Sequence, residues 1–422
     1  MQGGMSGTAV PRNHELGGNM DHFLQDLVVV DAATFLAGPG AATMLGDFGA
    51  TVIKIEPPGG DGYRGLVGRY PVPYHWQLTS RNKQSLAVDL RKDAGQQLLH
   101  QIIAKADVMT TNFMPSQLAR YQLTYPTLQA INPRLVYAHI TGYGDEGPEI
   151  ERRAFDVTGW WARSGMMEFV RDPGQTPLMP APGMGDHSTA TALFAAIMSG
   201  LYKRERTGQG CRVSTSLAAN GVWANGMALQ GVIAGNDLAE HRQTAGWLNP
   251  LSTAYGCADG SYLVLTMINT GREYPKLCEA LGHSEWLEDE RFADVRQAMR
   301  NRDVLHQKIA EAFAQMNYDE AANRLDEQGI TYGKVQTMSQ VLEDPQFRAA
   351  GIVVETGDTQ GDFDLTISSP INISGETKKT PSRAPEIGAD SVEVLRQLDF
   401  QEAYIQELVG AEVVIDGASS GN

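Results

Sequence analysis

The residue of this sequence whose surroundings best suit chemistry is Asp186. It follows a glycine-rich turn, Gly183-Met184-Gly185, and precedes a run without charged residues at 188–202, which predicts a buried helix. Aspartate is among the residues preferred at a helix N-cap, where its oxygen satisfies free N–H groups of the first turn. The pattern alone therefore favours an ordinary cap, and a reactive carboxylate needs support from the rest of the chain.

Two cations could bind phosphate. Arg81 and Lys83 immediately precede an apolar stretch at 85–90 that is typical of a buried strand. This place suits a phosphate, although solvated charges at the end of a loop are commoner. The pair is therefore a weak indication of an anionic ligand.

A second motif imitates a dinucleotide-binding site. Gly38 and Gly40 follow a predicted strand, and Glu56 closes the next one. The third glycine of the fingerprint is missing, however, because Thr43 stands in its place. We therefore do not expect a nicotinamide or flavin cofactor.

Composition excludes several classes of partner. The chain has 34 basic and 50 acidic residues, and its net charge of -16 repels nucleic acid. Its three cysteines have no metal-ligand spacing, and their odd number suits a reducing compartment, so we expect a cytoplasmic protein without a metal site. No apolar run approaches the ~18 to 20 residues of a membrane helix, and no signal peptide is recognisable. We expect neither nucleic-acid nor membrane binding.

The elements that must position Asp186 belong to an alternating pattern. Short apolar runs predict strands at 27–31, 51–56, 85–90, 108–113 and 135–140, and helical patterns such as 41–48 and 93–106 separate them. This alternation predicts an α/β fold with a doubly wound, mostly parallel, Rossmann-like sheet. Ligands bind beyond the carboxyl ends of such strands, where Glu56, Asn112, Phe113 and Tyr143 fall.

The sequence also changes character along its length. Residues 1–20 predict a flexible leader, and 21–234 predict the large α/β domain. A hairpin with an Asp259-Gly260 turn, followed by amphipathic helices, indicates a smaller α+β domain over 235–331. We expect 332–422 to return to the large domain.

Several motifs, each weak alone, occur together in the order and spacing of one known family. They are Ala37-Gly38-Pro39, GATVIKIE at 49–56, Asn82-Lys83-Gln84-Ser85, ADV at 106–108 with Asn112-Phe113, TGYGDEGP at 141–148, Gly185-Asp186 and TGQG at 207–210. With these motifs the chain resembles the class III CoA-transferases, the formyl-CoA transferase and carnitine-CoA transferase-like family. Around Phe155-Asp156 and at 183–187 it looks most similar to the 2-hydroxyacyl and aryl-lactate CoA-transferases.

The resemblance implies that Asp186 is a nucleophile, which reverses the preference for a simple cap. Such enzymes move CoA from an acyl-CoA donor to a carboxylic acid acceptor through an aspartyl anhydride and an aspartyl-CoA thioester. A carboxylate suits this role because it conserves the energy of the thioester as an anhydride. A helix N-terminus favours the anion by ~0.3 to 1 kcal/mol, so we expect Asp186 to be ionised at neutral pH. We also expect the preceding glycines to let the substrate approach closely.

The resemblance further implies the partners and the residues that bind CoA. Coenzyme A and acyl-CoA are substrates, with no tightly bound cofactor, and the other partners are a small carboxylic acid and a second copy of the chain in an interlocked homodimer. The likeness assigns the adenosine and phosphates of CoA to Phe35, Leu36, Ala37, Lys83, Asn112, Phe113, Arg120 and Tyr143. Pro57 and Thr141 replace cations of some members, and the glycine-rich lid of the oxalate-specific enzymes is absent, which leaves an oxalate and formate substrate pair without support.

Two other functions stay open. An α-methylacyl-CoA racemase shares the implied fold but removes the α-proton with an aspartate partnered by a histidine. The histidine expected before Asp156 is Phe155 here, which disfavours racemisation, although His187 adjoins Asp186 and could substitute. A CoA-binding protein without turnover is the third interpretation, and the presence of Asp186 argues against it.

Overall fold

The structure is a computed structural model that describes residues 21–66, 73–244 and 248–418. The predicted leader, 1–20, lies outside the described residues.

Contacts between residues divide the chain into two compact units. The first contains the chain up to Met166, Met179–Asn225 and the chain from Val354, and the second contains Met167–Leu178 and Gly226–Val353. The sequence predicts domain boundaries after residues 234 and 331, whereas the contacts place them after Asn225 and Val353. In both divisions a middle segment is separate from a unit that the flanking parts of the chain form.

The first unit is built on a seven-stranded sheet with the order β12-β3-β2-β1-β4-β5-β6. Its strands are β1 (Val28–Asp31), β2 (Thr51–Glu56), β3 (Lys83–Val88), β4 (Val108–Thr111), β5 (Val136–Thr141), β6 (Cys211–Ser216) and β12 (Val414–Ile415). All neighbours are parallel except β12 and β3, where Val414 pairs with Val88. The strand order reverses between β1 and β4, which is a topological switch point. The predicted α/β fold with a mostly parallel sheet is confirmed, and β12 is an edge strand that the sequence analysis missed.

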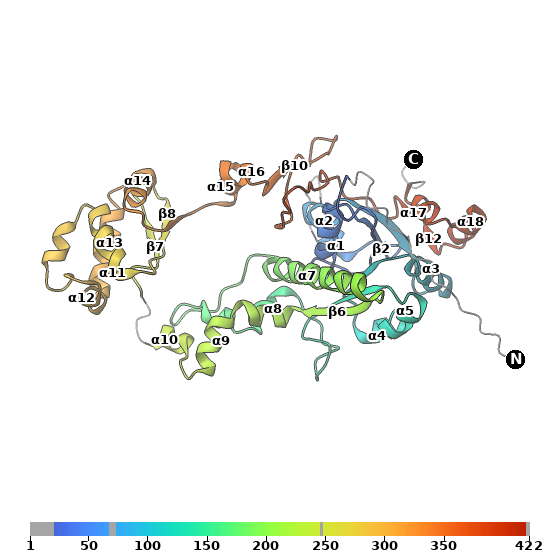
Figure 1. Cartoon of the computed structure of the whole chain (residues 1–422), viewed down its shortest axis with the longest axis horizontal. Helices are drawn as coiled ribbons and strands as arrows, with labels where there is room; N and C mark the ends of the chain where they lie inside the picture. Colours follow the sequence, from blue (N-terminus) through green and yellow to red (C-terminus); the bar gives the residue numbers. More distant parts are fainter. Residues whose placement is uncertain (1–20, 67–72, 245–247, 419–422) are drawn as a thin grey trace. The chain divides into compact units, whose positions relative to one another are not determined.

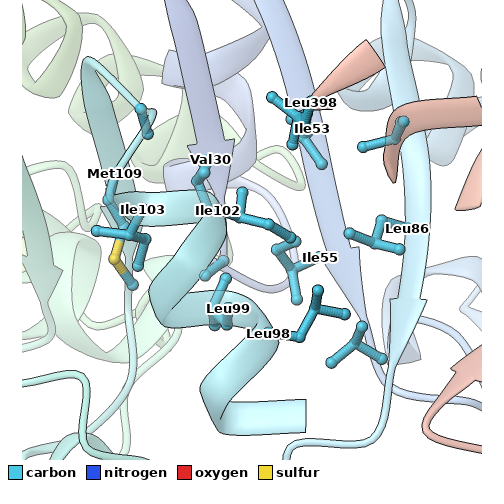
Figure 2. Packing of buried hydrophobic residues seen from close by; sticks show 14 of the residues in the cluster. Val30, Ile53, Ile55, Leu86, Leu98, Leu99, Ile102, Ile103, Met109 and Leu398 are labelled. Carbon is cyan, nitrogen blue, oxygen red and sulfur yellow. The ribbon is translucent and has the colours of Figure 1, made fainter. Parts of the chain in front are cut away.

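Both faces of this sheet are buried, which explains the continuous apolar runs. In β1, Val30 contributes to the core on one face and Val29 to the core on the other. Figure 2 shows the first of these cores, where Leu99 and Ile102 of α3 (Asp93–Ile103) lie against the strands. Burial of each such side chain stabilises the fold by about 1.5–3 kcal/mol.

Helix α7 (Met184–Thr207) covers the opposite face together with α1 (Ala37–Asp47) (Figure 1). A Cβ atom at Gly40 of α1 would lie 3.1 Å from the Cβ of Ala190, so a small residue lets the two helices pack closely. Helix α7 connects β5 to its parallel neighbour β6, and its N-terminus therefore lies at the carboxyl edge of the sheet.

The remaining elements of the first unit connect strands or cover the sheet. They are η1 (Gly62–Gly65), α2 (Tyr74–Ser80), α4 (Pro115–Arg120), α5 (Tyr125–Ile131), the π-helix η2 (Asp156–Ala162), α8 (Leu217–Ala224), β11 (Leu365–Ile367), α17 (Ser391–Gln397) and α18 (Glu402–Gly410), while α6 (Met166–Phe169) and β10 (Val353–Glu355) fall at the divisions between units. Helix α8 ends at Asn225, whose amide donates to the Ser164 carbonyl at 3.0 Å. Helices α17 and α18 are separated where Asp399 adopts a φ of 60°.

The second unit is a small antiparallel sheet with helices. Its elements are α9 (Gly226–Ile233), α10 (Leu238–Thr244), β7 (Ala254–Gly256), β8 (Tyr262–Leu265), α11 (Thr270–Ala280), η3 (Ser284–Glu288), α12 (Val295–Arg300), α13 (Arg302–Phe313), α14 (Tyr318–Gln328), β9 (Tyr332–Val335), α15 (Met338–Glu343) and α16 (Pro345–Ala349). The predicted hairpin is confirmed, since β7 and β8 are antiparallel and Gly260 in their turn has a φ of 79°. Strand β9 pairs with β8 and begins immediately after residue 331, the predicted end of this domain.

Candidate active site

Asp186 is the third residue of α7, and the helix is capped by Gly183, whose φ of 77° suits glycine. Its side chain makes no capping hydrogen bond, and the described parts of the chain supply no other hydrogen bond to this carboxylate. The helix-cap interpretation is therefore wrong. The structure leaves a half-buried carboxylate without a partner at the carboxyl edge of the sheet.

The first turn of α7 packs against the π-helix η2. A Cβ atom at Gly185 would lie 2.7 Å from the Cβ of Trp160 and 3.0 Å from the Cβ of Asp156, so this packing requires glycine. Asp156 is 8% exposed, and its Oδ1 accepts a hydrogen bond from the N–H of Val157 at 2.8 Å. Its Oδ2 is buried and has no hydrogen-bond partner in the described structure. Asp156 and Asp186 thus lie on adjoining helical turns.

The environment of Asp186 changes its acidity. Burial, and then the neighbouring Asp156 carboxylate, raise the pKa of Asp186 to about 7. The helix N-terminus is too weak to oppose this, because it is worth ~0.3 to 1 kcal/mol whereas one pKa unit is about 1.4 kcal/mol. The expectation that Asp186 is fully ionised at neutral pH is therefore wrong, and near pH 7 the two protonation states are comparably populated.

The loop after β1 supplies one wall beside α7. Phe35 has a positive φ of 63°, an uncommon conformation for a bulky residue, and its ring lies 5.5 Å from Phe155 and 6.0 Å from Tyr63, between centroids. The next residue, Leu36, is buried, with a methyl group 3.0 Å from a Cβ position at Gly183. These contacts bring the predicted residues Phe35 and Leu36 next to the start of α7, and Ala37 begins α1 directly behind them.

Buried ion pairs hold this loop. The Lys54 ammonium lies 3.0 Å from Asp61 and also donates to the carbonyl of Ala33, in the turn that leads to Phe35. The N–H of Phe35 donates to the same Asp61 at 3.4 Å. The ion pair and these hydrogen bonds therefore hold the strained backbone of Phe35 in place.

Glu56, the residue that imitated a ribose ligand, is structural. Arg64 binds both of its carboxylate oxygens, at 2.7 and 2.8 Å, and Ser85 donates to it at 2.7 Å. Its carboxylate is buried and satisfied by these partners.

Lys83 departs from its predicted place as an open cation for phosphate. Its fully buried ammonium donates to Asp31 at 2.9 Å and to the carbonyl of Pro39 at 2.8 Å. Burial lowers the pKa of Lys83 to about 8, against the attraction of Asp31. In this structure Lys83 is part of a core ion pair.

Asn112 joins the two loops at the switch point. Its amide donates to the carbonyl of Thr34 and accepts the N–H of Thr34, both at 2.9 Å. The loops after β1 and β4 are thereby fixed to each other at the carboxyl edge. This is the place where the sequence pattern predicts a ligand.

Phe113 and Arg120 meet through Tyr121. The centroid of Phe113 lies 5.8 Å from that of Tyr121, and the Arg120 guanidinium lies 5.6 Å from the Tyr121 ring. Arg120 is exposed, so its charge is open to a ligand.

Tyr143 is accompanied by two cations that the sequence analysis did not single out. Arg163 and Arg152 lie 5.0 and 5.5 Å from its ring centroid, and both are exposed. Both also pair with Glu149, at 2.9 Å for Arg163. Arg152 and Arg163 are candidate phosphate ligands because they lie near the TGYG motif in space. The sequence does not show this proximity.

Tyr63 and His75 were also missed. Their rings stack with centroids 5.8 Å apart. Burial, and then the charges of Asp186 and Asp156, raise the pKa of Tyr63, which places it within electrostatic range of both carboxylates. The only sequence signal for this pair is an aromatic cluster in a loop region.

The paired tryptophans, for which core packing is the safer expectation from sequence, are buried. Trp160 and Trp161 are 5% and 6% exposed, and their rings stack with centroids 6.0 Å apart. Trp160 nevertheless borders the site, because it packs against Gly185.

A polar cavity of about 560 Å³ lies at the other edge of the sheet, among the amino ends of β2 and β3. It contains Asn82, Lys83 and Lys379 but none of the residues around Asp186. Within the described chain we find no group of three His, Cys, Asp or Glu residues placed to hold a metal. No described helix is long and apolar enough to cross a membrane.

The fold is thus a doubly wound, mostly parallel α/β sheet, and an unpaired carboxylate of raised pKa lies at its carboxyl edge. The chain belongs to CoA-transferase family III, whose family model matches residues 24–391, and it is therefore a family III CoA-transferase.

Relatives agree with this assignment. The chain is 30% identical to the (R)-2-hydroxy-4-methylpentanoate CoA-transferase of Clostridioides difficile, an alignment that covers 93% of this chain and 99% of the relative. It is 28% identical to the cinnamoyl-CoA:phenyllactate CoA-transferase of Clostridium sporogenes, over 92% of this chain and 97% of the relative. Among solved structures, a CaiB/BaiF family protein from Brucella suis superposes with a TM-score of 0.79 at 30% identity, over 90% of this chain and 100% of that one.

Proposed function

We propose that this CoA-transferase uses Asp186 as its nucleophile. The observation that carries the proposal is the unpartnered Asp186 carboxylate at the start of α7, beside the loop after β1. Neighbouring backbone N–H groups of the first helical turn are suited to stabilise a developing oxyanion.

The steps balance without an added base. The Asp186 carboxylate attacks the acyl-CoA carbonyl, which breaks the C–S bond and gives an acyl-aspartyl anhydride and CoA thiolate. The thiolate attacks the aspartyl carbonyl and releases the donor acid, which leaves an aspartyl-CoA thioester. The acceptor carboxylate attacks that thioester to form a second anhydride, and the thiolate then takes the acceptor acyl group and frees Asp186.

The raised pKa sets the pH range of this reaction. Only the ionised form of Asp186 attacks, and with a pKa of about 7 its fraction rises steeply through neutral pH. A carboxylate of higher pKa is also a stronger nucleophile once ionised. The rate of acylation is therefore expected to increase with pH up to about 8.

For CoA we retain the predicted groups at the carboxyl edge and change the cations. Arg120, Arg152 and Arg163 are exposed, whereas Lys83 is held in the core. Phe35, Leu36, Ala37, Asn112, Phe113 and Tyr143 complete the proposed binding surface. Exposed guanidinium groups bind phosphate oxygens well, which supports the three arginines as phosphate ligands.

We propose 2-hydroxy acids with an apolar side chain as the substrates. The relatives named above act on 2-hydroxy-4-methylpentanoate and phenyllactate. The rings of Phe35, Phe155 and Tyr63 offer an apolar surface beside Asp186 for such a side chain.

The interlocked homodimer implied by the family resemblance also stays a proposal. Support comes from large apolar side chains that the single chain leaves exposed, among them Trp223 at 86%, Met227 at 90% and Ile233 at 77%. Light scattering of the purified chain should give twice the mass of one chain, and a monomer at all concentrations would contradict the proposal.

The mechanism is tested by trapping. The purified chain is incubated with 4-methylpentanoyl-CoA and hydroxylamine, and its peptides are analysed by mass spectrometry. We expect a hydroxamate on Asp186, and we expect Asp186→Ala to lower CoA transfer by roughly 10⁴-fold or more. Asp26→Asn is the matched control, because Asp26 is exposed and lies just before β1, at the amino edge of the sheet.

Three outcomes contradict parts of the proposal. Full transfer activity in Asp186→Ala excludes Asp186 as the nucleophile. Exchange of the α-proton of the acyl group in D₂O without CoA transfer indicates the racemase instead. Binding of acyl-CoA without either reaction indicates a non-catalytic CoA-binding protein.

A further inference from the structure

Asp156 carries a carboxylate oxygen that the fold does not satisfy. Its Oδ2 is buried and unpartnered within the described chain, although the residue is only 8% exposed. A buried polar group without a hydrogen bond costs about 1–3 kcal/mol, and more when it is charged. Such a group is rarely retained unless something outside the fold supplies the missing donor.

The unpaired oxygen is next to the reacting group. The Cβ of Asp156 lies 3.0 Å from a Cβ position at Gly185, the residue before Asp186. The two carboxylates also interact electrostatically. A ligand bonded to the Asp186 carboxylate is therefore within electrostatic range of Asp156.

A second unpaired polar atom lies on the same π-helix. The indole N–H of Trp160 is buried without a partner in the described structure, and the side chain is packed against Gly185. The short segment of η2 that borders Asp186 thus has one unused acceptor and one unused donor. π-Helical turns of this kind occur frequently at functional sites.

On the basis of the proposed nucleophile Asp186, we infer that Asp156 determines substrate specificity: its Oδ2 accepts a hydrogen bond from the 2-hydroxyl group of the acid whose carboxyl carbon reacts. The hydroxyl is one carbon from the reacting carboxyl group, so acylation of Asp186 brings it to the neighbouring turn. A hydrogen bond from a neutral hydroxyl to a carboxylate is strong in a buried site.

Charge disfavours a substrate that carries a second carboxylate. A second carboxylate on the substrate would face both Asp156 and Asp186, and like charges in a buried site repel. A substrate with only hydrogen at carbon 2 leaves Oδ2 of Asp156 unsatisfied. A site built to bind a hydroxyl discriminates strongly against the analogue that lacks it. The site therefore favours 2-hydroxy acids over both dicarboxylates and unsubstituted acids.

The test compares two thioesters that differ only in the hydroxyl. (R)-2-Hydroxy-4-methylpentanoyl-CoA and 4-methylpentanoyl-CoA are each reacted with the full-length enzyme and hydroxylamine, and the rate of Asp186 hydroxamate formation is measured. We expect the wild type to prefer the hydroxy thioester at least about 10-fold. Asp156→Ala should reduce this preference to about one, and Asp156→Asn should reduce it partly, because an amide oxygen is a weaker acceptor.

The control is again Asp26→Asn, which changes an exposed aspartate at the amino edge and should keep the full preference. An unchanged ratio in folded Asp156 variants, with or without a shifted pH profile, would show that Asp156 only tunes Asp186 and would overturn the inference. Equal wild-type rates for the two thioesters would also overturn it. If neither thioester modifies Asp186, the proposed nucleophile itself fails, which is a distinct result.

Discussion

The first unit contains two groups of buried or half-buried carboxylates, one paired with cations and the other not. Beneath the loop after β1, Asp31, Glu56 and Asp61 each face a cation at 2.7–3.0 Å. Asp186 at the start of α7 interacts electrostatically with Asp156 of η2, and no cation is bonded to either among the described residues.

The difference is visible in acidity. Burial would raise the pKa of Asp31, but Lys83 and Lys54 lower it below its ordinary value. Burial also acts on Asp186, and there Asp156 adds to it, so that the pKa rises to about 7. The paired Asp31 stays charged and fixes the loop, whereas the protonation of the unpaired Asp186 changes near neutral pH. Partners, more than burial, therefore separate the structural carboxylates from the proposed nucleophile.

The largest expected effect comes from breaking a pair. Asp31→Ala leaves the Lys83 ammonium buried without its carboxylate, and such a loss should cost about 3–5 kcal/mol of unfolding free energy. Urea denaturation followed by circular dichroism measures it. A loss below about 1 kcal/mol would show that the pair is not structural, and Asp31→Asn, which keeps a hydrogen-bond acceptor, should lose less.

The unpaired carboxylate should behave in the opposite way. Its folded pKa of about 7 lies above the ordinary 3.8, so Asp186 destabilises the fold progressively as pH rises from about 4 to 7, and constantly above that. Asp186→Asn should therefore be more stable than wild type by about 1–4 kcal/mol at pH 8 and nearly equal to it at pH 4.

Thermal unfolding at the two pH values measures this effect. Asp89→Asn is the control of opposite sign, because hydrogen bonds from Arg91 lower the pKa of Asp89 and its removal should cost stability at pH 8. A stability difference between Asp186→Asn and wild type that does not depend on pH would refute the assignment of a raised pKa.

A smaller effect sharpens the contribution of Asp156. Removing its charge in Asp156→Asn should lower the pKa of Asp186, so the acid limb of the kcat/KM profile should move to lower pH. Burial is the larger cause of the shift and remains in the variant, so only part of the rise should be abolished. No movement of the acid limb would mean that the two carboxylates are not coupled.

The smallest change in unfolding free energy is expected for an ion pair that is exposed to solvent. Arg324 and Glu320 form an exposed i,i+4 pair at 2.8 Å on α14. Glu320→Gln should change the unfolding free energy by no more than about 0.5 kcal/mol. A loss comparable to that of Asp31→Ala would show that pairing alone, without burial, controls stability here.

Much of the fold could be predicted because its parallel strands are buried on both faces. Runs such as 27–31 and 51–56 are mostly apolar and do not alternate strictly with polar residues, which distinguishes them from amphipathic strands. Strand β12 contains two residues, Val414 and Ile415, and a segment this short has no periodicity to detect. It is recognisable only from its pairing with β3.

The site was predicted less completely, since its chemistry depends on neighbours in space. The sequence indicates Asp186 through its glycine-rich turn, but its pKa depends on Asp156, thirty residues away in the chain and on another helix. Lys83 fits a phosphate ligand equally well until its contact with Asp31 is known. Gly185 was expected to let the substrate approach. Its packing against Trp160 is a contact between residues distant in the chain, which the sequence does not reveal.

Strand β12 has a consequence for the order in which the newly made chain can fold. The second unit is nearly continuous in sequence, from Gly226 to Val353, and its sheet can close as soon as that segment leaves the ribosome. The first unit must wait for Val414 and Ile415 to cover the open edge of β3. Until then the strand that carries Lys83 presents unpaired backbone groups, which makes this edge the place where a nascent chain is most exposed to wrong pairing.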